Sequence, residues 1–184
     1  MKIFFELVYF IFPLLFAGLL HHLVIIKYNL FPYLSMPIDC NWRFIGKPLF
    51  GKSKTWRGVL LVPLLSGVGS LIISQILLVP TILHPFFTGL LLGVGYSISE
   101  LPNSFIKRRL DIPAGEKANT KYHIFFLVLD QTDSIIGSIL ILLLIYPASF
   151  TLCISILIIG TLLHFAVDQY LFKHGYKKLR KNRE

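Results

Sequence analysis

Residues 124–146 read IFFLVLDQTDSIIGSILILLLIY, a block that carries only two charged side chains, Asp130 and Asp133. An α-helix rises about 1.5 Å per residue, so a block of this length can cross the roughly 30 Å hydrocarbon core of a bilayer. The block lacks the alternating polarity of a lipid-facing β-strand, and lipid admits only helices or closed barrels. It therefore predicts a membrane-spanning helix with two aspartates inside it.

Similar apolar blocks lie on both sides of this one. Hydrophobic residues make up 55% of the 184-residue chain, and the mean hydropathy is +0.72, which is well above the usual range for soluble domains. We predict an all-α integral membrane protein that forms a single domain over residues 1–184. Its spans, about five in number, are expected at residues 3–26, 59–79, 82–98, 124–146 and 148–167. Prolines predict tight connections at Pro80–Thr81 and at Pro147.

The basic residues predict the orientation of these spans. Segments 27–57, 99–123 and 168–184 hold 17 of the 18 Lys and Arg residues, and only Lys2 falls on the opposite side. The positive-inside rule makes these three segments cytoplasmic in a plasma (inner) membrane, with the N-terminus outside and the C-terminus, a basic tail, inside. Such a basic surface suits anionic lipid headgroups or phosphorylated substrates. No motif favours nucleic acid as a partner.

The first cytoplasmic segment contains the glycine-rich and basic stretch GKPLFGKSKTWRG at residues 46–58. Its glycines let backbone N–H groups approach an anion closely, Lys54 and Arg57 supply positive charge, and Thr55 supplies a hydroxyl. These features predict phosphate binding. The stretch is not assigned as a P-loop, because the strand context is absent. A basic anchor at the membrane surface explains the same residues equally well.

The second cytoplasmic segment begins SELPNSFIKRR at residues 99–109. If this region is helical, a carboxylate, a hydroxyl and two cations share one face, since they lie at positions i, i+4, i+7 and i+8. These residues are Glu100, Ser104, Lys107 and Arg108. A stop-transfer cluster at 107–109 would explain the charges but not Glu100 or Ser104.

The aspartates of the opening block give the sharpest functional indication. Asp130 and Asp133 are three residues apart, hence on one helical face, and each costs at least ~2.5 kcal/mol to place in a membrane. Paired carboxylates suit Mg²⁺, which completes its shell with water and substrate phosphate. The alternative is that they cap a shorter helix that begins near Ser134. His21 and His22, near the end of the first block, are expected to pack at the membrane interface.

The order and spacing of these pieces resemble the CDP-archaeol synthases, integral-membrane relatives of the phosphatidate cytidylyltransferases. The resemblance extends from about residue 46 to the last helix and rests on the motifs KTWRG at 54–58, SFIKRRL at 104–110 with IPAG at 112–115, and LDQTD at 129–133 with Gly137. Ser99-Glu100 replaces the Gly-Asp of the family pattern and keeps its acidic charge. His164, Asp168 and Gln169 stand in the last span where the family pattern has a His and an Asn.

The resemblance implies that a cytidylyl group is transferred from CTP to a membrane lipid phosphate, which gives a CDP-lipid and pyrophosphate for phospholipid biosynthesis. It implies four catalytic residues: Asp130, Asp133, Glu100 and Lys107. The three carboxylates among them would hold Mg²⁺. It also implies a set that binds the substrates, made up of Lys54, Thr55, Arg57, Ser104 and Arg108. Either a monomer or a homo-oligomer is compatible with this chemistry.

Two other functions fit parts of the pattern. In a non-enzymatic lipid or ion transporter, or a lipid-binding membrane protein, the aspartates would serve an ion pathway. In a membrane prenyltransferase, the Asp-x-x-Asp pair would bind a lipid diphosphate through Mg²⁺, and CTP would have no role.

Overall fold

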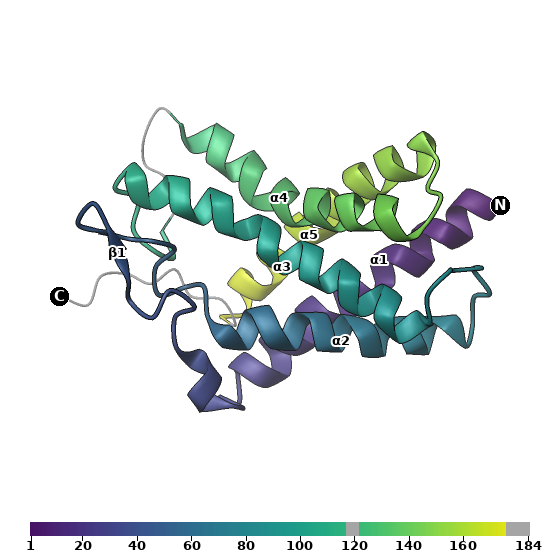
Figure 1. Ribbon diagram of the computed structural model, residues 1–184, viewed down its shortest axis with the longest axis horizontal. Helices are drawn as coiled ribbons and strands as arrows, with labels where there is room; N and C mark the ends of the chain where they lie inside the picture. Colours follow the sequence, from purple (N-terminus) through teal and green to yellow (C-terminus); the bar gives the residue numbers. More distant parts are fainter. Residues whose placement is uncertain (117–121, 176–184) are drawn as a thin grey trace.

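The computed structural model describes residues 1–116 and 122–175. Five α-helices dominate these ranges, and short elements follow the first of them (Figure 1). The elements are α1 (Lys2–Leu20), the π-helix η1 (His21–Ile26), the 3-10 helix η2 (Pro32–Ser35), β1 (Arg43–Phe44), β2 (Lys47–Pro48), α2 (Trp56–Ser74), α3 (Pro85–Arg109), α4 (His123–Ile145) and α5 (Phe150–Lys173). Lys117, Lys121 and most of the predicted basic tail lie outside the described residues.

The helices form a ring in which each one packs on its neighbours along the chain and α5 returns to α1. Figure 1 shows α3 between α2 and α4. Apolar side chains fill the interior, among them Phe10 of α1, Leu142 of α4 and Leu152 of α5, each at most 2% exposed. All five helices therefore share one core, as a single-domain chain requires.

Small residues let α3 approach both of its neighbours closely. A Cβ atom added to Gly89 would lie 2.3 Å from the carbonyl oxygen of Ser66 on α2. One added to Gly137 of α4 would lie 2.3 Å from the carbonyl oxygen of Gly95. Helices in membranes associate through such small-residue contacts, because lipid provides little hydrophobic driving force between them.

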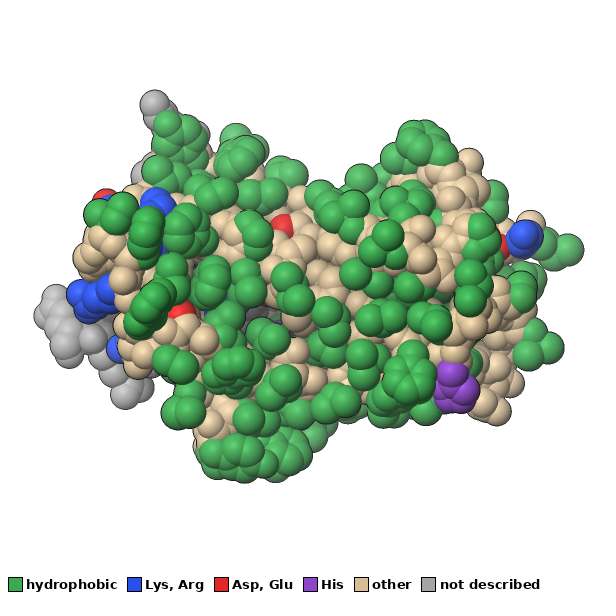
Figure 2. All heavy atoms as spheres, viewed as in Figure 1, with side chains coloured by type: hydrophobic (Ala, Val, Ile, Leu, Met, Phe, Trp, Pro, Cys, Tyr) green, Lys and Arg blue, Asp and Glu red, His purple; other side chains and the backbone are tan. Residues whose placement is uncertain are grey.

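The outer surface of the bundle is apolar. Figure 2 shows hydrophobic side chains over most of one face, with Lys and Arg gathered mainly at one end. Within the described ranges, four helices are long and apolar enough to cross a membrane: α1 continued by η1, α2, α4 and α5. Helix α3 is not among them, because glycine, serine and threonine dilute its apolar half and Glu100 begins its polar half. The chain is a multi-pass membrane protein.

Several element boundaries differ from the sequence prediction. Helix α2 begins at Trp56, where Thr55 accepts a hydrogen bond from Gly58 N at 3.4 Å, and it ends at Ser74 rather than at residue 79. Residues 75–84 make a longer connection than the predicted tight turn, since Pro80 and Pro85 keep the residues before them out of the α conformation. Helix α5 continues to Lys173, beyond the predicted residue 167.

Helix α3 extends well beyond its predicted end at residue 98, and this extension carries site residues. It continues through Pro102 to Arg109, so that the first half of the predicted second loop is helical. Proline removes one backbone donor from the helix but does not end it here. The face predicted for Glu100, Ser104, Lys107 and Arg108 therefore exists.

Candidate active site

A cavity of about 500 Å³ lies at the basic end of the bundle, and residues from all five helices line it. Each of the nine site residues predicted from the sequence is among them: Lys54, Thr55, Arg57, Glu100, Ser104, Lys107, Arg108, Asp130 and Asp133. The loop before α2 and the three helices α2, α3 and α4 carry these residues, which are spread over about 80 positions of the sequence. The fold brings them into one place.

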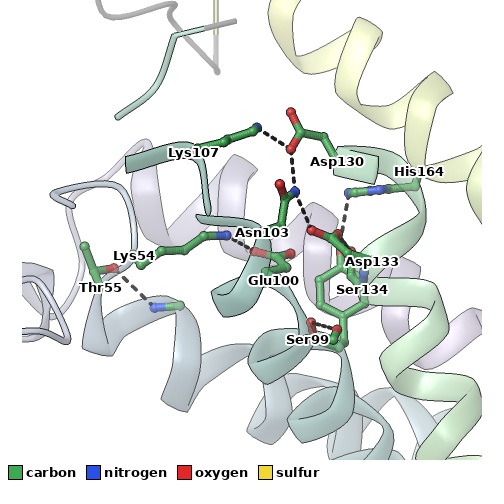
Figure 3. A network of polar contacts seen from close by, with 12 residues as sticks. Lys54, Thr55, Ser99, Glu100, Asn103, Lys107, Asp130, Asp133, Ser134 and His164 are labelled. Carbon is green, nitrogen blue, oxygen red and sulfur yellow. Dashed lines mark hydrogen bonds and ion pairs between the residues drawn. The ribbon is translucent and has the colours of Figure 1, made fainter. Parts of the chain in front are cut away.

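The carboxylates of both aspartates point toward the side-chain amide of Asn103 (Figure 3). The amide nitrogen of Asn103 donates to Asp130 Oδ1 at 2.7 Å and to Asp133 Oδ2 at 2.8 Å. Both aspartates lie inside α4, which begins at His123, so the alternative that they cap a helix starting near Ser134 is wrong. Asp133 is 8% exposed and also accepts a hydrogen bond from Ser134 N at 2.7 Å.

Two lysines bring positive charge to this group. Lys107 pairs with Asp130 and lies 5.5 Å from the centre of the Phe126 ring. Lys54, from the loop before α2, pairs with Glu100 of α3. The cavity therefore has acidic and basic walls side by side, which is the arrangement needed to hold a polyphosphate together with a cation.

The donor set fits a Mg²⁺ ion at the aspartate pair. The amide nitrogen of Asn103 lies within hydrogen-bond distance of both carboxylates, so a cation placed near its position could contact both aspartates. The amide oxygen of Asn103 is buried and has no hydrogen-bond partner among the described residues, so a rotated amide would add a third oxygen. Carboxylate and amide oxygens are the ligands that Mg²⁺ prefers.

Glu100, the predicted third metal ligand, pairs with Lys54 in the structure, and its metal role stays a prediction. Within the described ranges, no three His, Cys, Asp or Glu side chains gather as a group that could hold a metal. The Glu100 carboxylate accepts a hydrogen bond from the ammonium group of Lys54. The two-aspartate part of the prediction, joined by Asn103, is the part that the geometry favours.

Asp39 holds the loop that presents Lys54. Its carboxylate accepts hydrogen bonds from the backbone N–H groups of Phe50 at 2.9 Å, Gly51 at 3.0 Å and Asn41 at 3.0 Å. Burial raises the pKa of Asp39, but these donors outweigh burial and leave the pKa below its ordinary value. The loop is thus fixed by a residue that the sequence analysis did not single out.

Gly46, Gly51, Lys52 and Ser53 have the spacing of the P-loop pattern G-x-x-x-x-G-K-[ST]. The structure nevertheless excludes a P-loop at this stretch. Helix α2 begins three residues after Ser53, and the backbone N–H of Gly51 donates to the carboxylate of Asp39 rather than facing an open anion site.

Of the three arginines near the site, Arg57 and Arg108 line the cavity, and Arg109 supports the neighbouring loop. Arg108 donates through Nε to the carbonyl oxygen of Phe50 at 3.1 Å, and its buried Nη1 has no partner among the described residues. Arg57 also lines the cavity, but its Nη1 donates to Asn29 Oδ1 at 3.1 Å and to Leu30 O at 3.2 Å. Arg109 donates to carbonyl oxygens of the β1–β2 hairpin and so supports the loop.

Sequence reasoning missed two further features of the cavity. Asn103 lies three residues after Glu100 and four before Lys107, so the helical spacing already placed it on the same face. The other feature is a hydrogen-bonded pair, Tyr96 Oη and His164 Nε2 at 3.0 Å, which joins α3 to α5.

A ring of apolar helices that encloses paired aspartates and lysines at its basic end defines a multi-pass membrane protein with a built polar site. The sequence matches the family described as CarS-like, CDP-archaeol synthase, over residues 1–180. The chain belongs to this family.

Individual relatives agree with this assignment. The chain is 33% identical over 157 residues to a CDP-archaeol synthase of Methanospirillum hungatei, covering 79% of this chain and 89% of that protein. It is 28% identical over 154 residues to the CDP-archaeol synthase of Pyrococcus furiosus, covering 78% and 82%. A solved structure of an intramembrane enzyme for archaeal membrane lipid biosynthesis has the same fold, with a TM-score of 0.62, 21% identity and coverage of 89% and 93%.

Proposed function

We propose that this protein is a CTP-dependent cytidylyltransferase that converts a membrane lipid phosphate of the archaeol class into a CDP-activated lipid and releases pyrophosphate. The observation that carries this proposal is the convergence of Asp130, Asp133 and Lys107 in a cavity lined by all five helices. The family match over almost the whole chain supports it.

The reaction needs no nucleophile from the protein. An oxygen of the lipid phosphate attacks the α-phosphorus of CTP, the bond from that phosphorus to the bridging oxygen of the β-phosphate breaks, and pyrophosphate leaves with the bonding electrons. Negatively charged groups must therefore be held close together while charge builds on the leaving group. The protein's task is to position these groups and to neutralise their charge.

The chain's own residues suit this task. Lys54, Lys107 and the unpartnered Nη1 of Arg108 are cationic donors on the cavity wall. Thr55 and Ser104 add hydroxyl groups. Asp130 and Asp133, with the Asn103 amide, would hold Mg²⁺, which when bound supplies positive charge to the triphosphate.

We place the site at the cytoplasmic edge of the membrane. Figure 2 shows Lys and Arg concentrated at one end of the bundle. Figure 1 shows the N-terminus, and so the start of α1 at Lys2, at the other end. The positive-inside rule assigns the basic end to the cytoplasm, where CTP is present.

An isotope assay tests the proposal. Membranes that contain the protein are incubated with CTP labelled in the cytosine ring, Mg²⁺ and a panel of ether-linked and ester-linked lipid phosphates, and the lipids are extracted. Label in the lipid phase that depends on the lipid phosphate and on Asp133 is expected. Absence of labelled CDP-lipid for every member of the panel would refute the function, and lipid products that form without CTP would favour prenyl transfer.

A further inference from the structure

His21 is a buried polar side chain that no motif of the sequence explains. It was expected to pack at the membrane interface, but it is only 8% exposed and lines the polar cavity. Its Nε2 atom is buried without a hydrogen-bond partner among the described residues. A buried polar atom without a partner is costly, so an unpaired nitrogen on a cavity wall indicates a ligand that pairs with it.

His21 faces the cavity from the end of α1, as Gly18 does three residues earlier. Its backbone is still α-helical, and its N–H donates to the carbonyl oxygens of Ala17 and Gly18. From His21 the chain continues as the π-helix His21–Ile26, at whose end Lys27 N donates to His22 O, five residues earlier, at 3.3 Å. Such π-helical stretches are frequent at functional sites.

The surroundings of His21 suit an anion. Its ring lies beside the first turn of α2, where a Cβ atom added to Gly58 would be 3.9 Å from His21 Cε1. The N-terminus of a helix carries partial positive charge, and Arg57 of the same turn lines the cavity as well. An imidazole N–H, a helix N-terminus and a guanidinium together favour a phosphate oxygen.

The polar cavity meets an apolar cleft close to His21. Gly18, one turn earlier on α1, lines both the polar cavity and a narrow apolar cleft that runs between α1 and α5. Leu14 and Ile156 belong to this cleft, whereas Asp130 and Lys107 do not. Tyr96 and His164 also line both the cavity and the cleft, and His21, one turn from Gly18, lines the polar cavity beside this junction. The aspartate pair lies on the wall formed by α4.

We propose that His21 binds the phosphate of the lipid substrate, at the junction of the polar cavity and the apolar cleft between α1 and α5. The triphosphate of CTP occupies the part of the cavity between Asp130, Asp133 and Lys107. This subsite rests on the proposed function, because it assigns one of that function's two substrates to a place. The shared chemistry is a phosphate oxygen, so the test must separate the lipid from the nucleotide.

The first test uses steady-state kinetics of His21→Ala and His21→Gln. We expect the Ala variant to raise KM for the lipid phosphate about 10-fold, the size of effect given by the loss of one hydrogen bond to a charged group, with KM for CTP unchanged. The Gln variant restores a neutral donor and should recover most of the loss. His174→Ala, an exposed histidine outside the cavity, is the matched control.

The second test is steric. A Cβ atom added to Gly18 meets nothing within 4 Å, so a side chain can start there in open space, and Gly18→Leu extends it into the junction. We expect this variant to bind labelled CTP normally and to lose turnover with the lipid phosphate. Ala166→Leu, which adds three carbon atoms at an exposed position of α5 outside the cavity and the cleft, should match the wild type in both measurements.

The outcomes are distinct. A raised KM for CTP in the His21 variants, or unchanged lipid kinetics in both His21→Ala and Gly18→Leu, would overturn the subsite. Failure of the wild-type protein to form any CDP-lipid would instead refute the proposed function.

Discussion

The two ends of the bundle both bury a carboxylate, but they satisfy it differently. At the end near the N-terminus, Glu6 is 6% exposed, accepts a hydrogen bond from Tyr146 Oη at 2.6 Å and lies 3.7 Å from Lys2 Nζ. At the basic end, Asp133 is equally well bonded, but four side chains around the cavity keep buried polar atoms that lack partners in the described part of the chain. These atoms are His21 Nε2, Asn103 Oδ1, Arg108 Nη1 and Gln131 Oε1.

This difference separates a structural carboxylate from a functional one. A charged residue inside a membrane protein is costly wherever it lies, so its presence alone does not show what it does. Glu6 stabilises the fold through a closed pair. The cavity holds more hydrogen-bonding capacity than the protein itself uses, which is what a site that awaits a ligand requires.

The largest expected effect comes from removing one charge at the cavity. Asp133→Asn should lower kcat by at least about 1,000-fold, because losing a preorganised electrostatic contact to the reacting groups typically costs that much or slightly less, and a metal ligand is lost as well. Turnover of purified protein in detergent, normalised to folded protein, measures it. Glu6→Gln, an equally buried carboxylate at the other end, should stay within about 2-fold of wild type. Equal losses of kcat in the two variants would contradict the distinction between a structural Glu6 and a functional Asp133.

The next effect concerns the paired lysine. Lys107→Met keeps the length of the side chain but removes its charge, and we expect kcat/KM to fall about 100-fold as one cationic contact to phosphate is lost. The control is Lys47→Met, which removes a lysine from an ion pair with Asp111, whose side chain is 76% exposed. Since exposed ion pairs contribute little, that variant should retain most of its activity. Wild-type kinetics for Lys107→Met would exclude this residue from substrate binding.

A stability effect should appear at the other end. Glu6→Ala leaves the buried hydroxyl of Tyr146 without its acceptor, which should cost about 1–3 kcal/mol of folding stability. The expected result is a lower thermal unfolding temperature in detergent with near-normal turnover below that temperature. A variant that unfolds like the wild type would show that the pair is not structural.

The smallest effect concerns the loop that presents Lys54. The pKa of Asp39 is lowered in the folded protein, so its stabilising contribution is present above the unfolded pKa of about 4 and is lost as pH falls through the folded pKa. Asp39→Ala should therefore be about 1 kcal/mol less stable than the wild type at pH 7, and this gap should narrow as the pH falls below about 4. Thermal unfolding of both proteins over this pH range checks this, and a gap that does not change with pH would contradict it.

The helical membrane fold was predictable from the length of the apolar blocks, and the charged face of α3 from helical periodicity. Spacings of three and four residues were enough to place Asp130 beside Asp133, and Glu100 near Lys107. The end of α2 at Ser74 was missed, since apolar residues continue past the helix and hydropathy does not mark where a helix stops.

Contacts between distant segments were beyond this reasoning. Asn103 meets the aspartates across about 30 positions of sequence, and the Asp39 anchor depends on the folded path of the first loop. The cavity that His21 faces is completed by residues of α2, α3, α4 and α5, which lie far from it in the sequence. In each case the tertiary fold, rather than residue type or periodicity, decides the role.

The most direct test of the proposed reaction compares CTP labelled with ³²P at the α-phosphate and at the γ-phosphate, each supplied with the lipid phosphate and Mg²⁺. Attack on the α-phosphorus predicts that the α-label passes into the extracted lipid and that the γ-label appears in pyrophosphate. If the γ-label entered the lipid, or if neither label did while the protein remained folded, the assignment of this chain as a cytidylyltransferase would be contradicted.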